Sequence, residues 1–99
     1  MAYPKFIITQ DGYLRLGMVT LHRHLIEAGD ECLGGGYWRI NHFAKEIELS
    51  GASSDYGAPQ WHRINKLHLP EGYEGYNFVW NIGGKRLPLP MLLKQNRKI

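Results

Sequence analysis

The chain has 99 residues, of which 43% are hydrophobic and 21% are charged, and its formal net charge is +3. This balance excludes an intrinsically disordered chain, and the length allows one small domain with a single hydrophobic core. No apolar run approaches the about 20 residues that span a bilayer, and the single cysteine excludes an internal disulfide and a multi-cysteine zinc site, so we expect a cytoplasmic domain.

The first third of the chain is predicted to form two strands and a helix. Residues 5–9 (KFIIT) are a short apolar run, and the Asp11-Gly12 pair predicts a turn into a second strand over residues 13–17. From residue 18 the apolar spacing becomes that of an amphipathic helix, which Gly29 would end. The apolar stripe of this helix consists of Met18, Leu21, His22, Leu25 and Ile26.

The choice between helix and continued strand decides the meaning of the His22-Arg23-His24 motif. On a strand the two histidines would share a face and could bind one metal ion. On a helix they lie about 200° apart and cannot chelate together. We favour the helix, which predicts no metal site and a partly buried His22.

The central stretch, residues 32–57, predicts a hairpin with a glycine-rich entrance and a polar exit. Three consecutive glycines, 34–36, let another backbone or a ligand approach closely. The alternation that follows puts Trp38 and Ile40 on one face and Tyr37 and Arg39 on the other. A second strand over residues 46–49 leads into the loop 50–57, whose hydroxyl, carboxylate and N–H groups could hold a polar ligand.

The last third predicts a second short helix and a final strand. Pro59 fits the first turn of a helix, Trp61, Ile64 and Leu67 follow at helical spacing, and Pro70 ends the run. Residues 76–82 alternate as a strand. The order strand–strand–helix–strand–strand–helix–strand predicts an α+β fold, with a single mixed β-sheet of about five strands and two short helices. We expect the core to consist of Leu21, Leu25, Ile40, Ile47, Leu49, Ile64, Phe78 and Trp80.

The positive charge is concentrated at the C-terminal end. Residues 1–84 contain seven basic and nine acidic residues, whereas residues 85–99 contain five basic residues and no acidic one. We therefore predict a folded domain over 1–84 and a basic C-terminal tail over 85–99, with the 87–90 stretch unable to join a central strand because of its prolines. A nucleic-acid partner is expected only through this tail.

The central stretch also carries a family resemblance. The run CLGGG at residues 32–36, followed at a fixed distance by G-x-S-x-x-Y-G at residues 51–57, resembles the Janus/Ocnus family, which includes the phosphohistidine phosphatases. The resemblance extends to Trp80 and covers roughly half the chain. It implies the arrangement of the sheet and a site that handles phosphoryl groups, without a cofactor.

The resemblance also implies roles for particular residues. His22 is the candidate catalytic histidine, although another alignment places Val19 at that position. Lys5 and Ser53 match phosphate-binding positions, and the N–H groups of Ser53, Ser54 and Asp55 would form an anion-binding nest. The family arginine is replaced by Tyr37, with Arg39 two residues further on the same face as the substitute.

Two departures weaken the enzymatic prediction. Asp55 occupies the position of a small apolar residue, and a carboxylate there would repel a phosphate. The arginine position is also changed, as noted above. Two functions therefore stay open, a protein-histidine phosphatase-like hydrolase acting on a phosphoprotein, and a non-catalytic module that binds a protein or a small anion. The oligomeric state is not predicted.

Overall fold

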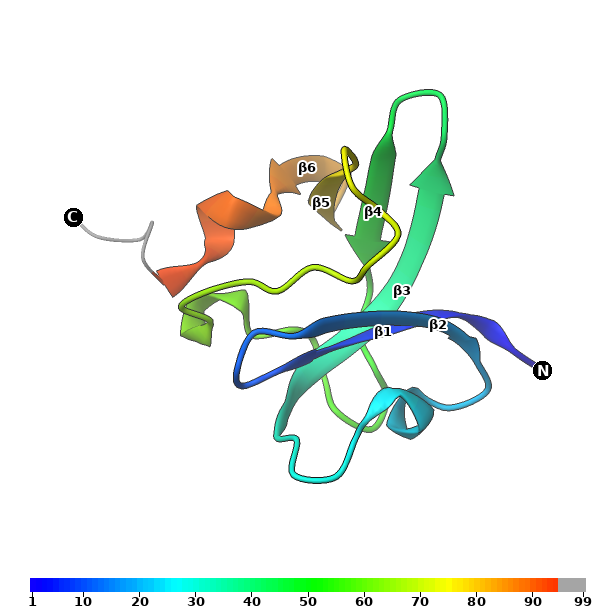
Figure 1. Cartoon of the computed structure of the whole chain (residues 1–99), viewed down its shortest axis with the longest axis vertical. Helices are drawn as coiled ribbons and strands as arrows, with labels where there is room; N and C mark the ends of the chain where they lie inside the picture. The colour runs from blue at the N-terminus through cyan, green and yellow to red at the C-terminus, as the bar shows by residue number, and fades with distance from the viewer. Residues whose placement is uncertain (95–99) are drawn as a thin grey trace.

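A computed structural model describes residues 1–94 of the chain, and its main element is one six-stranded mixed sheet (Figure 1). The strands are β1 (Tyr3–Thr9), β2 (Leu14–Val19), β3 (Cys32–Asn41), β4 (Glu46–Ser50), β5 (Asn77–Ile82) and β6 (Lys85–Pro88). Three 3₁₀ turns join them, η1 (His22–Leu25), η2 (Trp61–Arg63) and η3 (Leu89–Leu92). Residues 1–94 contain no α-helix.

The strand order in the sheet is β2-β1-β3-β4-β5-β6. Four of the five neighbouring pairs are antiparallel, and β4–β5 is parallel. A parallel pair needs a long crossover, which the loop over residues 51–76 provides without forming a helix. The turn at Gly12 joins β1 to β2, and a turn at Gly83-Gly84 joins β5 to a sixth strand that the sequence did not predict.

The predicted α+β fold is wrong, because neither of its two helices forms. The first was expected from residue 18 onward, but β2 continues to Val19, which pairs with Tyr3 of β1. This pairing removes the start of the helical stripe and leaves only the four residues of η1, without a side-chain N-cap. So short a segment cannot offset the cost of nucleating a helix.

The second predicted helix is replaced by the three-residue turn η2 and extended backbone. Ile64 already has φ −94° and ψ 125°, and its carbonyl oxygen accepts the N–H of Lys94. His68 then adds to the outer edge of β2, where its N–H donates to Gly12 and its carbonyl accepts from Leu14. Tertiary backbone hydrogen bonds thus take the groups that a helix would have used locally.

The core lies on one face of the sheet, under η2, η3 and the crossover loop. It includes Ile47, Leu49, Ile64, Phe78 and Trp80 as predicted, and Ile40 packs against it partly buried. The predicted core residues Leu21 and Leu25 are outside this cluster, because their segment covers the opposite face of the sheet. The core also contains Trp61 from the second predicted helix, together with several residues that the prediction omitted, namely Phe6, Ile8, Leu14, Leu33, Leu89 and Leu93.

The folded domain extends past Gly84 to the end of the described residues. Strand β6 pairs with β5 at the sheet edge, and Leu89 and Leu93 are buried in the core. Most of the predicted tail is therefore part of the fold, while its last five residues, 95–99, lie outside the described residues. The prolines limit β6 to an edge position, as expected.

The three glycines of β3 allow neighbouring backbone to approach where a side chain would not fit. A Cβ built on Gly34 would overlap the carbonyl oxygen of Ala58, one on Gly35 that of Phe6, and one on Gly36 that of Ser50. The space that the glycines clear is therefore occupied by the protein itself.

We predict that Gly36→Ala lowers the free energy of unfolding by about 3 kcal/mol, at the upper end of overpacking effects, because the opposing atom belongs to backbone. Urea denaturation measures this change. Ser54→Ala, in an exposed loop position, is the control and should stay within about 0.5 kcal/mol of the wild type. Equal stability of the two variants would contradict the close approach at Gly36.

Candidate functional site

His22 lies in η1 with its ring buried over the glycine stretch of β3. Its Cδ2 lies 3.2 Å from the position that a Cβ of Gly35 would occupy, and its Nε2 donates to the carbonyl oxygen of Gly36 at 2.8 Å. Because a carbonyl can only accept, this bond places a proton on Nε2. The ring of Tyr37 meets that of His22 edge-on, with centroids 5.5 Å apart. His22 therefore fastens η1 to the sheet through its Nε2.

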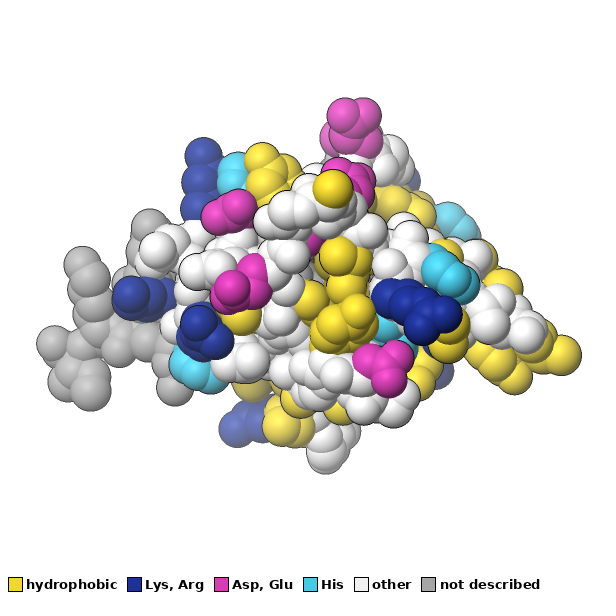
Figure 2. All heavy atoms as spheres, turned by 90° about the horizontal axis from the view of Figure 1, so that it is seen from below, with side chains coloured by type: hydrophobic (Ala, Val, Ile, Leu, Met, Phe, Trp, Pro, Cys, Tyr) yellow, Lys and Arg dark blue, Asp and Glu magenta, His cyan; other side chains and the backbone are white. Residues whose placement is uncertain are grey.

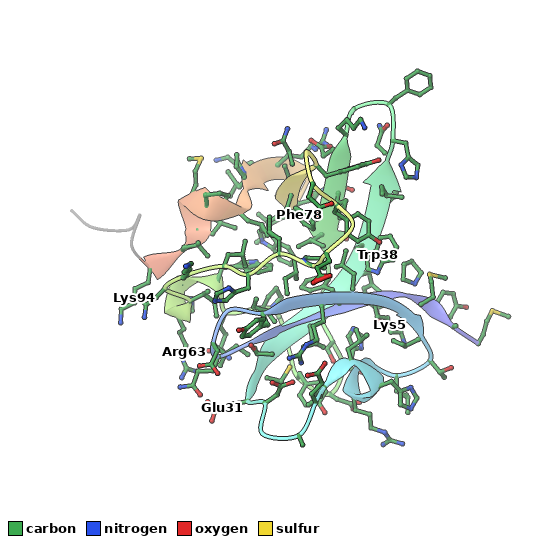
Figure 3. All side chains as sticks on the ribbon, viewed as in Figure 1. Lys5, Glu31, Trp38, Arg63, Phe78 and Lys94 are labelled. Carbon is green, nitrogen blue, oxygen red and sulfur yellow. The ribbon has the colours of Figure 1, made fainter. Side chains whose placement is uncertain are left out.

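Lys5, which is labelled in Figure 3, lies on the same face of the sheet as Gly35, against which the ring of His22 packs. It is opposite Tyr37 of β3 and Gly17 of β2, and its ammonium group donates to the carbonyl oxygen of Thr20, just before η1. The chain thus brings two predicted site residues, Lys5 and His22, to one region. Both of them bond to backbone carbonyls there.

The serine loop is docked on β3 by its own backbone. The N–H of Ser53 donates to the carbonyl of Gly35 at 3.0 Å, and the buried Ser53 Oγ accepts the N–H groups of Asp55 and Tyr56 at 3.2 and 3.1 Å. Two of the three N–H groups of the predicted anion nest, those of Ser53 and Asp55, are therefore used inside the protein. The side chains of Ser54 and Asp55 are exposed.

Arg39 belongs to an ion-pair network on the outer half of the same face. Its side chain is 80% exposed and pairs at 2.8 Å with Glu48, which is only 13% exposed. Arg86 of β6 contacts Glu48 at 3.5 Å and also pairs with Glu46. The structure therefore directs Arg39 to β4 and not to a phosphate position beside Lys5.

The tip of the β3–β4 hairpin, which the sequence did not predict as a site, projects from the body of the molecule (Figures 1 and 3). Phe43 at this tip is completely exposed. The turn is braced against Tyr76, whose hydroxyl is 2.6 Å from Nδ1 of His42 and whose ring lies 5.3 Å from the Nζ of Lys45. An aromatic residue in a polar hairpin turn was the signal available in the sequence.

Further hydrogen bonds hold the same tip. The N–H of Ala44 donates to the side chain of Asn41 at 3.1 Å, and the carbonyl of Lys45 accepts from Asn77 at 2.8 Å. Lys45 has φ 53°, a left-handed conformation that is uncommon outside glycine. At the base of the hairpin lies a cavity of about 460 Å³, lined by Arg39, His42, Phe43, Glu46, Glu48 and Arg86 among others. The tip is a defined structure that presents one large apolar side chain to solvent.

The described residues, 1–94, hold no cluster of metal ligands. No group of three or more histidine, cysteine, aspartate or glutamate side chains there could hold a metal ion, and His24 is exposed whereas His22 is buried. Burial raises the pKa of the Cys32 thiol, which contacts the carbonyl of Gly34 at 3.4 Å. Within the same residues, no helix is long and apolar enough to cross a membrane.

Comparison of the chain with protein-family models, with curated proteins and with solved structures finds no match. The function must therefore be argued from the molecule itself. Figure 2, which views the protein from the η1 side, shows acidic and basic side chains interspersed over that surface.

The segment after η1 is held against β2 by an ion pair with a predictable pH dependence. Arg15 forms a bidentate contact with the Asp30 carboxylate, which also accepts the N–H of Glu27. The hydrogen bond from Arg15, and after it the one from Glu27, lowers the pKa of the Asp30 carboxyl from its ordinary value. A carboxyl whose pKa is lowered by folding stabilises the folded protein at every pH above its pKa in the unfolded chain. This stabilisation is lost as the pH falls toward and through its pKa in the folded protein.

We therefore predict that the free energy of unfolding falls more steeply in the wild type than in Asp30→Asn between about pH 5 and pH 2. The amide of the variant does not titrate, so the difference between the two proteins should shrink as the pH falls. Urea denaturation at a series of pH values measures it. Parallel pH profiles would show that the ion pair does not stabilise the fold.

Proposed function

We propose that this domain is a non-catalytic protein-binding module that engages its partner through the tip of the β3–β4 hairpin. The observation that carries the proposal is the complete exposure of Phe43 on a turn fixed by several contacts to the body. A single exposed apolar residue on a mobile loop would need no explanation. An exposed apolar residue on a turn that is held in place resembles the anchor residue of an interface, because the turn has little conformational freedom to lose on binding.

The size of the expected effect follows from the side chain. Burying a phenylalanine in a partner contributes about 1.5–3 kcal/mol, which corresponds to a tenfold or larger change in affinity. Polar groups around the anchor can form the rim of an interface. His42 and Lys45 flank Phe43 on the tip, and the cavity at the base of the hairpin adds the ion-paired side chains of Arg39, Glu48 and Arg86.

The phosphoryl-group alternative is less well supported. In that function His22 would act as a base or a phosphoryl acceptor, but its Nε2 is bonded to Gly36. The ammonium group of Lys5 is likewise bonded to Thr20, and Ser53 holds its own loop. A site for phosphoryl transfer needs groups free to meet the developing charge. These contacts favour binding over hydrolysis.

The hairpin proposal is tested by comparing Phe43→Ala with Met91→Ala, a control at another highly exposed apolar residue. Immobilised wild type and variants are used to capture proteins from an extract of the native cell, with quantification by mass spectrometry. We expect Phe43→Ala to capture at least tenfold less of the proteins that the wild type and Met91→Ala both capture. The melting temperature of Phe43→Ala should equal that of the wild type. Equal capture by all three proteins would refute the hairpin as the binding surface.

The anion alternative has a separate test. During titration with inorganic phosphate, we expect the backbone amide NMR signals of Ser53 and Asp55 to stay unshifted, because their N–H groups already donate within the protein. Asp55→Ala should bring no gain in binding, since this side chain is exposed. Saturable shifts at these amides, stronger in Asp55→Ala, would instead support an anion site at the loop.

A further inference from the structure

A second surface, independent of the hairpin, lies at the outer edge of the sheet. Strand β2 is the last strand on its side, and the N–H of Leu14 points away from β1 to donate to His68 at 3.0 Å. The pairing of β1 with β2 has no register shift, so strand alternation turns the backbone groups of Leu16 and Met18 outward as well. Within residues 1–94, no backbone hydrogen bond is found to these outward groups.

The two edges of the sheet differ in how they are protected. The edge strand β6 has only four residues, begins with Lys85 and Arg86, and ends in Pro88, which has no N–H to donate. Short length, positive charge and proline all discourage the addition of a further strand. Strand β2 contains neither proline nor lysine, and Arg15, its only charged residue, is held by Asp30. The fold therefore leaves one edge open to pairing.

A groove lies directly in front of this open edge. It is a cavity of about 580 Å³ that reaches along β2 from Tyr13 to Leu16. One wall is the η1 segment with Leu25 and Glu27, and the other is the segment over residues 68–71, which contains Leu69 and Glu71. His68 already pairs with the edge at one end of this groove, so an added strand would continue a pairing that the chain itself begins.

The exposed charges of the groove are carboxylates. The side chain of Glu27 contacts Arg15 at 3.5 Å but stays 73% exposed, and Glu71 is also exposed. Arg15 is only 22% exposed and bonds to Asp30, so it does not present its charge to a ligand. Leu69 adds an exposed apolar side chain to one wall, and Leu25 a partly buried one to the other. The groove thus complements a segment with apolar and basic side chains.

We propose that the outer edge of β2 binds an extended, positively charged peptide segment as an added strand. The peptide backbone pairs with Leu16 and Met18, and its side chains alternate between the two walls, where Glu27 and Glu71 attract lysine or arginine. A second copy of this chain fits the groove less well, because its own β2 edge would bring no unpaired basic side chain to these carboxylates.

The probe is a capped heptapeptide of alternating valine and threonine with a lysine at each end, labelled with fluorescein for anisotropy measurements. Two control peptides match it, one with glutamate in place of both lysines and one with N-methyl groups on the backbone amides that would face β2. We expect the lysine peptide to bind at least tenfold more tightly than either control. Hydrogen exchange at Leu16 and Met18, followed by NMR, should slow at least tenfold in its presence.

Variants of the protein test the same contacts from the other side. Met18→Pro removes an outward N–H that β1 does not use, and Met18→Ala is its control. We expect the proline variant to lose binding at least tenfold, and the pair Glu27→Gln and Glu71→Gln to lose the preference for the lysine peptide. If the proline variant does not fold, the N-methylated peptide with wild-type protein still decides the role of the backbone.

Three results would overturn the proposal. The first is no saturable binding of the lysine peptide, and the second is equal binding of the N-methylated peptide. The third is protection of the Leu16 and Met18 amides that rises with protein concentration in the absence of peptide, because this would identify a second copy as the occupant of the edge.

Discussion

The close approach of backbone to the glycines of β3 is the constraint on which the rest of this structure depends. Here β1 pairs on one side of β3. The end of β4 and the first part of the crossover, which includes the serine loop, contact β3 from the other side. A side chain at any of the glycines 34–36 would separate these segments. Because β3 lies between the β1–β2 hairpin and the other half of the sheet, both halves of the domain depend on this joint.

The same joint explains why the residues that match the phosphatase pattern already make hydrogen bonds within the protein. His22, Lys5 and Ser53 all lie around the glycines, as a site would require. However, backbone that packs this tightly needs its carbonyl and N–H groups satisfied, and these side chains satisfy several of them. The residues that resemble a site therefore connect η1 and the serine loop to the sheet, and the resemblance to the Janus/Ocnus family stays a prediction.

The surfaces that remain for recognition lie at the periphery of the sheet. The parallel β4–β5 pair places the start of β5 beside the base of the β3–β4 hairpin, so that Tyr76 can brace the tip that carries Phe43. At the other end of the sheet, His68 covers only part of the outer edge of β2. One surface offers a side-chain anchor and the other offers backbone hydrogen bonds. These are two distinct chemistries for binding polypeptide.

The sequence by itself determined the local pattern of the strands, because a period of two depends only on which neighbouring residues face the core. It predicted β1, β2, β4, β5 and the later part of β3, together with five buried members of the core. It could not separate a short helix from a 3₁₀ turn at η1 and η2, because a few apolar residues at helical spacing fit both. Only the tertiary structure decided that choice, through hydrogen bonds between distant segments such as Ile64 with Lys94 and His68 with Gly12. The partners of His22 and Ser53 were decided in the same way, because they are backbone groups that only folding brings within reach.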